Sequence, residues 1–373
     1  MIRILHLIDS TADWQHRVAL GQLLDRLGPE RFECRLAATD VRAGAEVSPA
    51  DREVRPFRRL LGIDALAAPA LRSYLSGAGI DLIHAWGVSA AVTAAAAASA
   101  TPLVVELFDP AVCVAEARRI RSVFKPGGLA LICSSQTVRR RLIENGIAPE
   151  AAVVIRPGVD FALINAARKR DLRGKLGLNR DHRVVLVPAP VVRPGGHFTC
   201  YWAAVVRLLI EPGLRLILPG RSPEQARLVR LARGHGFEHL LTCPGDAVNY
   251  EELVAAADLM ITAPQGDYPT TALAWAMAAG VPVLGTAVYG IAELIAHRHN
   301  GLLVKPEAPR PTALRLAALF DHDDLTGLAD AARSQAYEVF GLRRCVDQHA
   351  DLYENLLAGR TPGEGIDDSA VCG

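Results

Sequence analysis

Short apolar runs alternate with segments of helical period along most of the chain. In the first half these runs predict strands at Ile2–Ile8, Cys34–Ala38, Asp81–His84, Leu103–Leu107, Leu129–Cys133 and Val153–Ile155. Between them lie segments whose apolar positions recur three or four residues apart, such as 18–27 and 138–145. Strands separated by helices predict βαβ units and a mostly parallel sheet.

The strand rhythm stops over residues 161–183, where the chain is polar and basic, and then resumes. The second series of predicted strands is Val184–Pro188, Leu214–Leu218, Leu240–Thr242, Leu259–Thr262, Val281–Leu284 and Gly301–Val304. The pattern therefore predicts an α/β fold of two Rossmann-like domains. Open α/β sheets bind ligands beyond the carboxyl ends of their strands, so we expect a cleft in which the two domains face each other.

The predicted organisation follows from these two series. We expect an N-terminal domain at 1–165, a linker at 166–182 and a C-terminal domain at 183–340. A helix at 341–358 and a flexible tail at 359–373 complete the chain.

Composition narrows the possible partners. The 373 residues suffice for two α/β cores, and the net charge of +1 provides no field that would attract a nucleic acid. The 7 cysteines are scattered without a Cys-x-x-Cys pair, so we expect free thiols instead of a disulfide framework or a zinc site. The first apolar run is too short for a signal peptide, and no run approaches the roughly 20 residues that span a membrane. We therefore expect a cytoplasmic protein.

The second half contains several separated motifs. They are AADLMITAP at 256–264, Asp267, TTALAWAMAAGVPVL at 270–284, YGIAE at 289–293 and NGLLV at 300–304. In order and spacing they resemble the donor-binding region of the retaining family 4 glycosyltransferases, which have the GT-B fold. Looser matches are IDLIHAWG at 80–87, RPGVD at 156–160 and RGKLGL at 173–178, so the resemblance covers most of residues 1–305.

The resemblance implies a function. A protein of this family moves a hexose from a nucleotide-sugar to a hydroxyl acceptor with retention, without a metal or a further cofactor. The acceptor would be a sugar or a lipid-linked molecule. The donor diphosphate would lie at the N-terminus of a helix that begins near Thr270 and Thr271, where free N–H groups and the helix dipole favour an anion. An ordinary buried helix capped by a threonine is the alternative.

The chain departs from the family where the family neutralises the diphosphate. Pro190 and Gly195 occupy the positions of the family's arginine and lysine. Arg193 and His197 lie close by and are candidate substitutes. Gly195 and Gly196 would let backbone N–H groups approach the anion.

Another cation stands after a neighbouring predicted strand. Arg221 follows Leu214–Leu218 and is a further phosphate candidate, with a solvated surface arginine as an equal alternative.

The candidate catalytic residues are Asp267, His84 and Asp109. Asp267 matches the first of the family's two glutamates, whereas Trp275 stands at the second and is expected in the core, because an indole cannot accept hydrogen bonds. Asp109 keeps the aspartate of the family's His–Asp pair. His84 ends a predicted strand at the cleft rim, and a structural role is its alternative.

These losses leave two functions open. Removing two charge-assisted phosphate contacts would cost about 3–6 kcal/mol, and one helix N-terminus returns only about 0.3–1 kcal/mol. Either other cations take over, or the protein is a catalytically silent GT-B module that binds a sugar or a partner. A sugar-nucleotide epimerase would need a carboxylate and histidine set that the motifs do not supply.

The basic segment Arg52–Leu61 also has two interpretations. Weak peripheral contact with a membrane that holds the acceptor is one, and a solvated basic loop is the other.

Overall fold

The computed structural model describes residues 1–8, 14–39, 54–57, 67–98, 101–108, 114–123, 128–189, 191–245, 248–267 and 271–366. The chain forms two compact units. Unit 1 contains residues 1–158 and the segment that begins at Leu342, and unit 2 is Val159–Gly341. The segment 166–182, expected as a linker, lies inside unit 2, and the helix expected at 341–358 belongs to unit 1.

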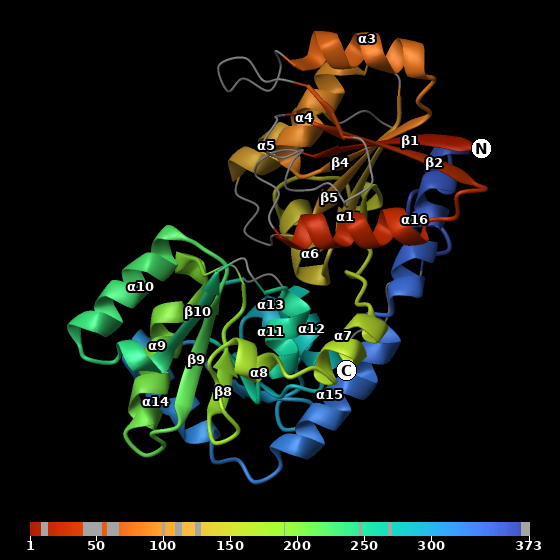
Figure 1. Cartoon of the computed structure of the whole chain (residues 1–373). Helices are drawn as coiled ribbons and strands as arrows, with labels where there is room; N and C mark the ends of the chain where they lie inside the picture. The colour runs from red at the N-terminus through yellow and green to blue at the C-terminus, as the bar shows by residue number, and fades with distance from the viewer. Residues whose placement is uncertain are drawn as a thin grey trace. The chain divides into compact units, whose positions relative to one another are not determined.

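Unit 1 is built on a seven-stranded parallel sheet with the order β3-β2-β1-β4-β5-β6-β7 (Figure 1). Its strands are β1 (Ile2–Ile8), β2 (Phe32–Ala38), β3 (Val54–Pro56), β4 (Leu82–Trp86), β5 (Leu103–Leu107), β6 (Leu129–Cys133) and β7 (Ala152–Val154). Its helices are α1 (Trp14–Arg26), α3 (Ala68–Ala78), α4 (Val88–Ala97), α5 (Val114–Val123), α6 (Gln136–Glu144) and α16 (Leu342–Leu357). Two apolar layers cover this sheet, one on each face.

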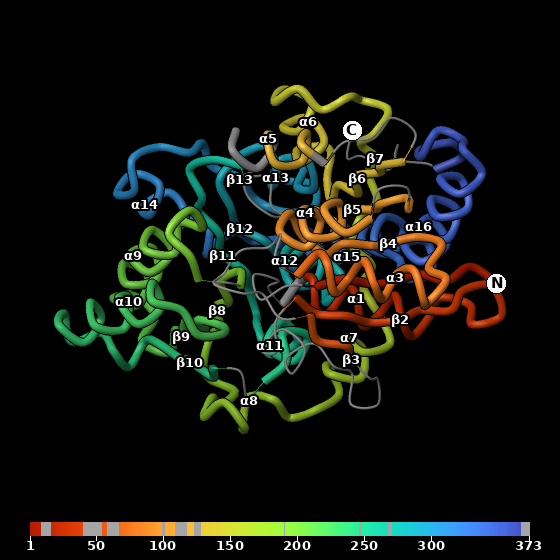
Figure 2. The backbone as a smooth tube through the Cα atoms, turned by 90° about the horizontal axis from the view of Figure 1, so that it is seen from above, coloured from red at the N-terminus to blue at the C-terminus, as the bar shows by residue number. Residues whose placement is uncertain are grey.

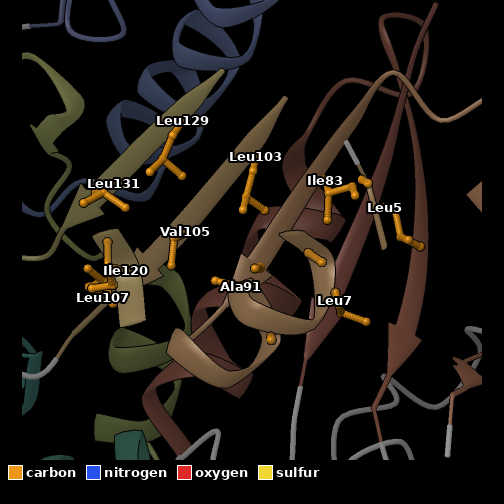
Figure 3. Close-up of a cluster of buried hydrophobic side chains, with 14 of the residues drawn as sticks. Leu5, Leu7, Ile83, Ala91, Leu103, Val105, Leu107, Ile120, Leu129 and Leu131 are labelled. Atoms are coloured by element: carbon orange, nitrogen blue, oxygen red, sulfur yellow. The ribbon is translucent and has the colours of Figure 1, made fainter. Parts of the chain in front are cut away.

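The first layer joins the sheet to α3, α4, α5 and α6. Figure 3 shows Leu103, Val105 and Leu107 of β5 on one side of their strand, with Leu107 close to Ile120 of α5. All of these side chains are buried. Since alternate residues of a strand face the same side, the intervening residues of β5 face the second layer.

The second layer joins the sheet to α1 and α16. The two helices contact each other, although more than three hundred residues of chain separate them (Figure 1). Val346, Ala350 and Tyr353 lie on the buried side of α16 at spacings of three and four residues. The sequence predicted the extent of this helix, and the structure shows that it completes the core of unit 1.

Unit 2 is built on a six-stranded parallel sheet with the order β10-β9-β8-β11-β12-β13. Its strands are β8 (Arg183–Leu186), β9 (Leu214–Pro219), β10 (Leu241–Gly245), β11 (Leu259–Thr262), β12 (Val283–Thr286) and β13 (Leu302–Val304). Its helices are α7 (Phe161–Arg168), α8 (Leu172–Lys175), α9 (His197–Leu208), α10 (Pro223–Gly234), α11 (Tyr250–Ala256), α12 (Thr271–Ala279), α13 (Tyr289–Ala292), α14 (Pro309–Leu319) and α15 (Leu325–Val339).

Helices cover both faces of the second sheet. The helices α9 and α14 lie side by side against one face, where they share an apolar core with the strands (Figure 2). The helix α12 instead packs against α7, α11 and α15. The prediction of two Rossmann-like α/β domains with parallel sheets is thus confirmed, and the cleft in which they face each other stays a prediction.

The segment that follows α16 differs from expectation. The structure describes residues 359–366 of the expected flexible tail, and they pack on unit 1: the Asn355 side chain donates to the Glu364 carbonyl at 2.7 Å, and Ile366 contacts the second layer.

The strand β3, at the edge of the first sheet, was not predicted, because three residues ending in proline give no periodic signal.

Part of the segment Arg52–Leu61 is described, with Arg52 and residues 58–61 outside the described ranges. Phe57 is 5% exposed, and the Arg55 guanidinium lies 4.6 Å from the centre of the Tyr74 ring. The Phe57 ring therefore belongs to the core of unit 1 instead of an apolar surface for lipid. In the described part of the chain, no helix has the length and hydropathy needed to cross a membrane.

Candidate functional site

The strand order of unit 2 places a topological switch point between β8 and β11. From β8 the chain continues through α9 to β9 on one side, and from β11 it continues through α12 to β12 on the other. Because parallel crossovers are right-handed, the two connections leave toward opposite faces of the sheet. The carboxyl edge of β8 and β11 is therefore the position where an open α/β sheet binds ligands.

The first feature of this edge is the start of α9. Gly196 precedes the helix with a φ of 67°, and within the described ranges no side chain caps the first turn. A Cβ atom at Gly196 would overlap the carbonyl of Ala263, which follows β11. The glycine thus allows the start of α9 to lie directly against the end of β11, and the N–H groups of its first turn point out of the helix without a side-chain cap.

The second feature is the start of α12 at Thr271. This residue is 4% exposed, and its hydroxyl has no hydrogen-bond partner among the described residues. The hydroxyl of Thr262, at the end of β11, is also buried and also lacks a hydrogen-bond partner within the described ranges. An unsatisfied buried hydroxyl costs about 1–3 kcal/mol. The Thr271 hydroxyl is therefore an unpaired donor, within the described residues, at the positive end of α12, whereas Thr270 lies outside the described residues.

The predicted cations follow the adjacent strands β8 and β9. Arg193 belongs to the loop between β8 and α9, its side chain is 75% exposed, and its Nε lies 3.6 Å from Oε1 of Glu224 on α10. Arg221 follows β9 and lies over Gly245 at the end of β10. Exposed ion pairs contribute little stability, so Arg193 can turn to an anion at small cost.

His197 has a different position from the one predicted. Its side chain is 1% exposed, with Nδ1 3.0 Å from the Val192 carbonyl and Nε2 2.9 Å from the Pro188 carbonyl. Both ring nitrogens therefore contact backbone oxygens, and neither contacts solvent. The prediction that this imidazole binds a phosphate directly is corrected, because its nitrogens are already used within the loop.

The predicted carboxylate Asp267 lies after β11 and is partly exposed. It is on the segment that connects β11 to α12, beside the features described above. Trp275 is 2% exposed and belongs to the core around α12, as the sequence analysis expected.

His84 is placed in the core of unit 1 instead of at a rim. Its side chain is fully buried, its Nδ1 lies 2.7 Å from the Tyr353 hydroxyl of α16, and its ring stacks on Trp86 with 4.5 Å between centroids. The catalytic role predicted for His84 is therefore corrected to a structural one, because the imidazole faces α16. Asp109, the other candidate of unit 1, lies outside the described residues.

The sequence analysis missed the polar cluster around His84. Oε2 of Glu106, on β5, lies 3.4 Å from Nε2 of both His84 and His349. The signal was a glutamate in the otherwise apolar strand LVVEL and a His and Tyr four residues apart on the buried side of α16. Among the described residues, no group of three or more His, Cys, Asp or Glu side chains is arranged to hold a metal ion.

Burial and charge pairing oppose each other in this cluster. Burial works against charge on Glu106, but hydrogen bonds from His349 and His84 leave the pKa of the Glu106 carboxyl below its usual value. Burial likewise works against charge on His349, but contacts with Cys345 and Glu106 place the pKa of His349 well above its usual value. Burial lowers the pKa of His84. A charged Glu106–His349 pair with a neutral His84 follows.

Comparison with known proteins identifies the two units. The family model described as Glycosyltransferase Family 4 matches residues 16–163, and the model described as Glycosyl transferases group 1 matches residues 197–322. Together they cover about three quarters of the chain.

Curated relatives and solved structures agree with these models. The chain is 30% identical over 155 residues to N-acetyl-alpha-D-glucosaminyl L-malate synthase of Bacillus anthracis, which is 41% of each protein. It is 26% identical over 225 residues to D-inositol 3-phosphate glycosyltransferase 1 of Catenulispora acidiphila, 57% of this chain and 54% of that protein. The matches span about half the length of these relatives. The crystal structure of Anabaena HepE with UDP and glucose superimposes with a TM-score of 0.80 at 22% identity, covering 95% of this chain and 100% of that one.

Two Rossmann-like units with parallel sheets and a ligand edge at a switch point define a protein of the GT-B class. The chain belongs to family 4 of the glycosyltransferases.

The charged pair in unit 1 predicts how stability depends on pH. The contribution of Glu106 is present above the usual glutamate pKa and is lost as the pH falls through its lowered pKa. The contribution of His349 is present below the usual histidine pKa and is lost as the pH rises through its raised pKa. Glu106→Gln should therefore lower the free energy of unfolding most between about pH 4.5 and 6.5, by about 1–3 kcal/mol.

Urea unfolding at a series of pH values measures this effect. Glu150→Gln, on an exposed residue of the same unit, is the matched control and should leave the profile unchanged. A loss of stability in Glu106→Gln that is the same at every pH would contradict the charged pair.

The close approach of Gly196 to Ala263 predicts that alanine substitution destabilises the protein more at Gly196 than at Gly177. Gly177 has nearly the same φ, 68°, but a Cβ atom there meets nothing within 4 Å. Gly177→Ala should thus cost only the strain of the left-handed conformation, about 1–2 kcal/mol. Gly196→Ala should cost about 1–3 kcal/mol more, because the methyl group displaces α9 from β11. Equal stabilities of the two variants in urea unfolding would refute the close contact.

Proposed function

We propose that this protein transfers a hexose from a nucleotide-sugar to a hydroxyl group of a sugar or lipid-linked acceptor, with retention and without a metal. The donor diphosphate binds at the carboxyl edge of β8 and β11. The observation that carries the proposal is the meeting of two helix starts at this edge, one without a side-chain cap at Gly196 and one with the unpaired buried hydroxyl of Thr271 within the described residues.

The helix starts account for only part of the binding energy. Each returns about 0.3–1 kcal/mol to an anion in the first turn, so α9 and α12 together replace at most about one of the two charge-assisted contacts of about 1.5–3 kcal/mol each. Arg193 supplies the missing contact, because its guanidinium is exposed and is paired only loosely with Glu224 at 3.6 Å. Arg221 is the second cation of this edge, at the end of β9.

The same groups act on the leaving group. When the bond from the sugar to the diphosphate breaks, negative charge accumulates on the departing oxygen. Three sets of hydrogen-bond donors at this edge favour this charge: the N–H groups of the first turns of α9 and α12, the Thr271 hydroxyl and the Arg193 guanidinium. The acceptor hydroxyl then attacks from the face that the diphosphate leaves, which gives retention, and its proton passes to the diphosphate.

Asp267 is the proposed sugar contact. Its carboxylate is partly exposed on the segment from β11 to α12, where it can accept hydrogen bonds from hydroxyls of the donor. The buried Trp275 indole stands where the family has its second glutamate, so the ribose hydroxyls are held by other groups than in the family pattern. Because the HepE complex contains UDP, a UDP-sugar is the first donor to test.

A catalytically silent binding protein is the second candidate. The buried Trp275 favours it, because a family carboxylate is replaced by a side chain that has no acceptor. Such a protein would bind a nucleotide-sugar or a sugar without turnover.

Calorimetry with UDP-glucose, GDP-mannose and ADP-glucose tests the proposal, followed by an assay for release of the free nucleotide in the presence of sugar acceptors. Binding of one donor together with nucleotide release supports the transferase. Binding without release under any acceptor supports the silent module, and no binding of any donor at millimolar concentration overturns the transferase.

Arg193→Ala should weaken binding of the nucleotide-sugar at least about tenfold, because it removes a charge-assisted phosphate contact. Arg230→Ala is the matched control, because Arg230 is an exposed arginine nearer the C-terminal end of α10. Calorimetry should show unchanged affinity for the control. If Arg193→Ala also keeps its affinity, the substitute cation lies elsewhere.

Thr271→Val should separate binding from folding. The substitution keeps the side-chain shape and removes a buried hydroxyl that lacks a partner among the described residues, so stability should be unchanged or slightly raised. Donor affinity should fall about fivefold to tenfold with the loss of one hydrogen bond. Thr93→Val, in unit 1, should leave donor affinity unchanged. A Thr271→Val protein that binds the donor like the wild type would remove Thr271 from the site.

A further inference from the structure

His197 lies between two backbone acceptors. The carbonyl oxygens of Pro188 and Val192 are 2.9 and 3.0 Å from its two ring nitrogens. A neutral imidazole has one N–H donor and one lone pair, so it satisfies only one of these oxygens and turns its lone pair toward the other. The protonated ring donates to both. The loop is therefore shaped for an imidazolium.

The buried surroundings of the ring oppose that charge. Burial lowers the pKa of His197, and hydrogen bonds to the Pro188 and Val192 carbonyls offset this only in part. No charged side chain among the described residues contributes to the shift. Among the described residues, the elements around the ring carry several titratable or charged groups, which include Arg193 in the loop, Cys200 and Tyr201 on α9, Glu224 and Arg227 on α10, Arg221 after β9 and Asp267 after β11.

The position of His197 couples it to the proposed diphosphate site. It is the first residue of α9, so its backbone N–H belongs to the turn that would face the anion. An opposite charge within about 4–6 Å raises the pKa of a histidine by about 1–3 units. A diphosphate at the start of α9 would supply such a charge.

We propose that His197 takes up one proton from solvent when the nucleotide-sugar binds, and that the resulting imidazolium, held by the Pro188 and Val192 carbonyls, provides buried positive charge beside the diphosphate. His197 is thus a positioning residue that acts through the loop and its charge, without touching the donor. This inference rests on the proposed function.

The proposal fixes the sign of the pH dependence. Because the bound form holds the proton more tightly, donor affinity is highest below the pKa of the free protein. It falls by up to about tenfold per pH unit between the free and bound pKa values, and it is constant again above the bound value.

Calorimetry of the wild-type protein at pH 7 in buffers of different ionisation enthalpy measures the proton directly. The probe is the nucleotide-sugar that binds among UDP-glucose, GDP-mannose and ADP-glucose. These are diesters of diphosphate, so they lack the ionisation near pH 6 of a terminal phosphate and leave the protein as the source of the signal. We expect an uptake of up to one proton per site, largest at a pH between the free and the bound pKa of His197, so the measurement is repeated from about pH 5 to 8.

Variants assign the proton to the residue. His197→Gln should abolish the uptake and flatten the pH dependence of the affinity, whereas His239→Gln, on an exposed histidine of the same unit, should change neither. Should His197→Gln fail to fold, the pKa of His197 in the wild type, followed by NMR of labelled histidine with and without the donor, gives the same answer.

Three results are distinguishable. Proton uptake that disappears in His197→Gln, or a His197 pKa that rises on binding, supports the proposal. Donor binding with no proton uptake, or with uptake that persists in His197→Gln, overturns it and leaves the transferase proposal intact. No binding of any donor overturns both.

Discussion

The proposed site depends on the close approach of Gly196 to the Ala263 carbonyl. This contact sets the start of α9 against the end of β11, and only a residue without a Cβ atom permits it at the observed φ of 67°. After β11 the chain continues to Thr271, where α12 begins on the face of the sheet opposite to α9. Two positive helix ends are thereby brought to one edge of the sheet, where an anion gains from both.

The chemistry of this edge differs from the family pattern in how charge is supplied. The family's arginine and lysine positions hold Pro190 and Gly195. The chain instead has an exposed guanidinium at Arg193 and a buried imidazole at His197, both within the loop that precedes α9. An exposed arginine is available without a desolvation cost, and a buried histidine between two carbonyls acquires charge more readily when an anion stabilises it. Donor binding would then create part of its own binding site.

The sequence predicted most strands and the extent of α16, because apolar runs bounded by turn residues and a regular helical spacing are local signals. It could not predict that α16 joins unit 1, since an amphipathic helix shows that one face is buried but not what covers it. The misassignment of His84 has the same origin. The predicted strand ended at His84, which placed the residue at a rim, whereas β4 continues to Trp86. Alternation along the strand turns the His84 side chain toward Tyr353, distant in sequence. For His197, the spacing showed a cation candidate near the anion, and the two carbonyls that hold its ring came only from the folded loop.

The most direct test of the account is an NMR titration of the labelled protein with a nucleotide-sugar that binds. The account predicts that the largest changes in backbone amide shifts fall on the first turns of α9 and α12, around His197 and Thr271. Saturable binding that leaves these amides unchanged and perturbs another edge of either sheet would contradict it.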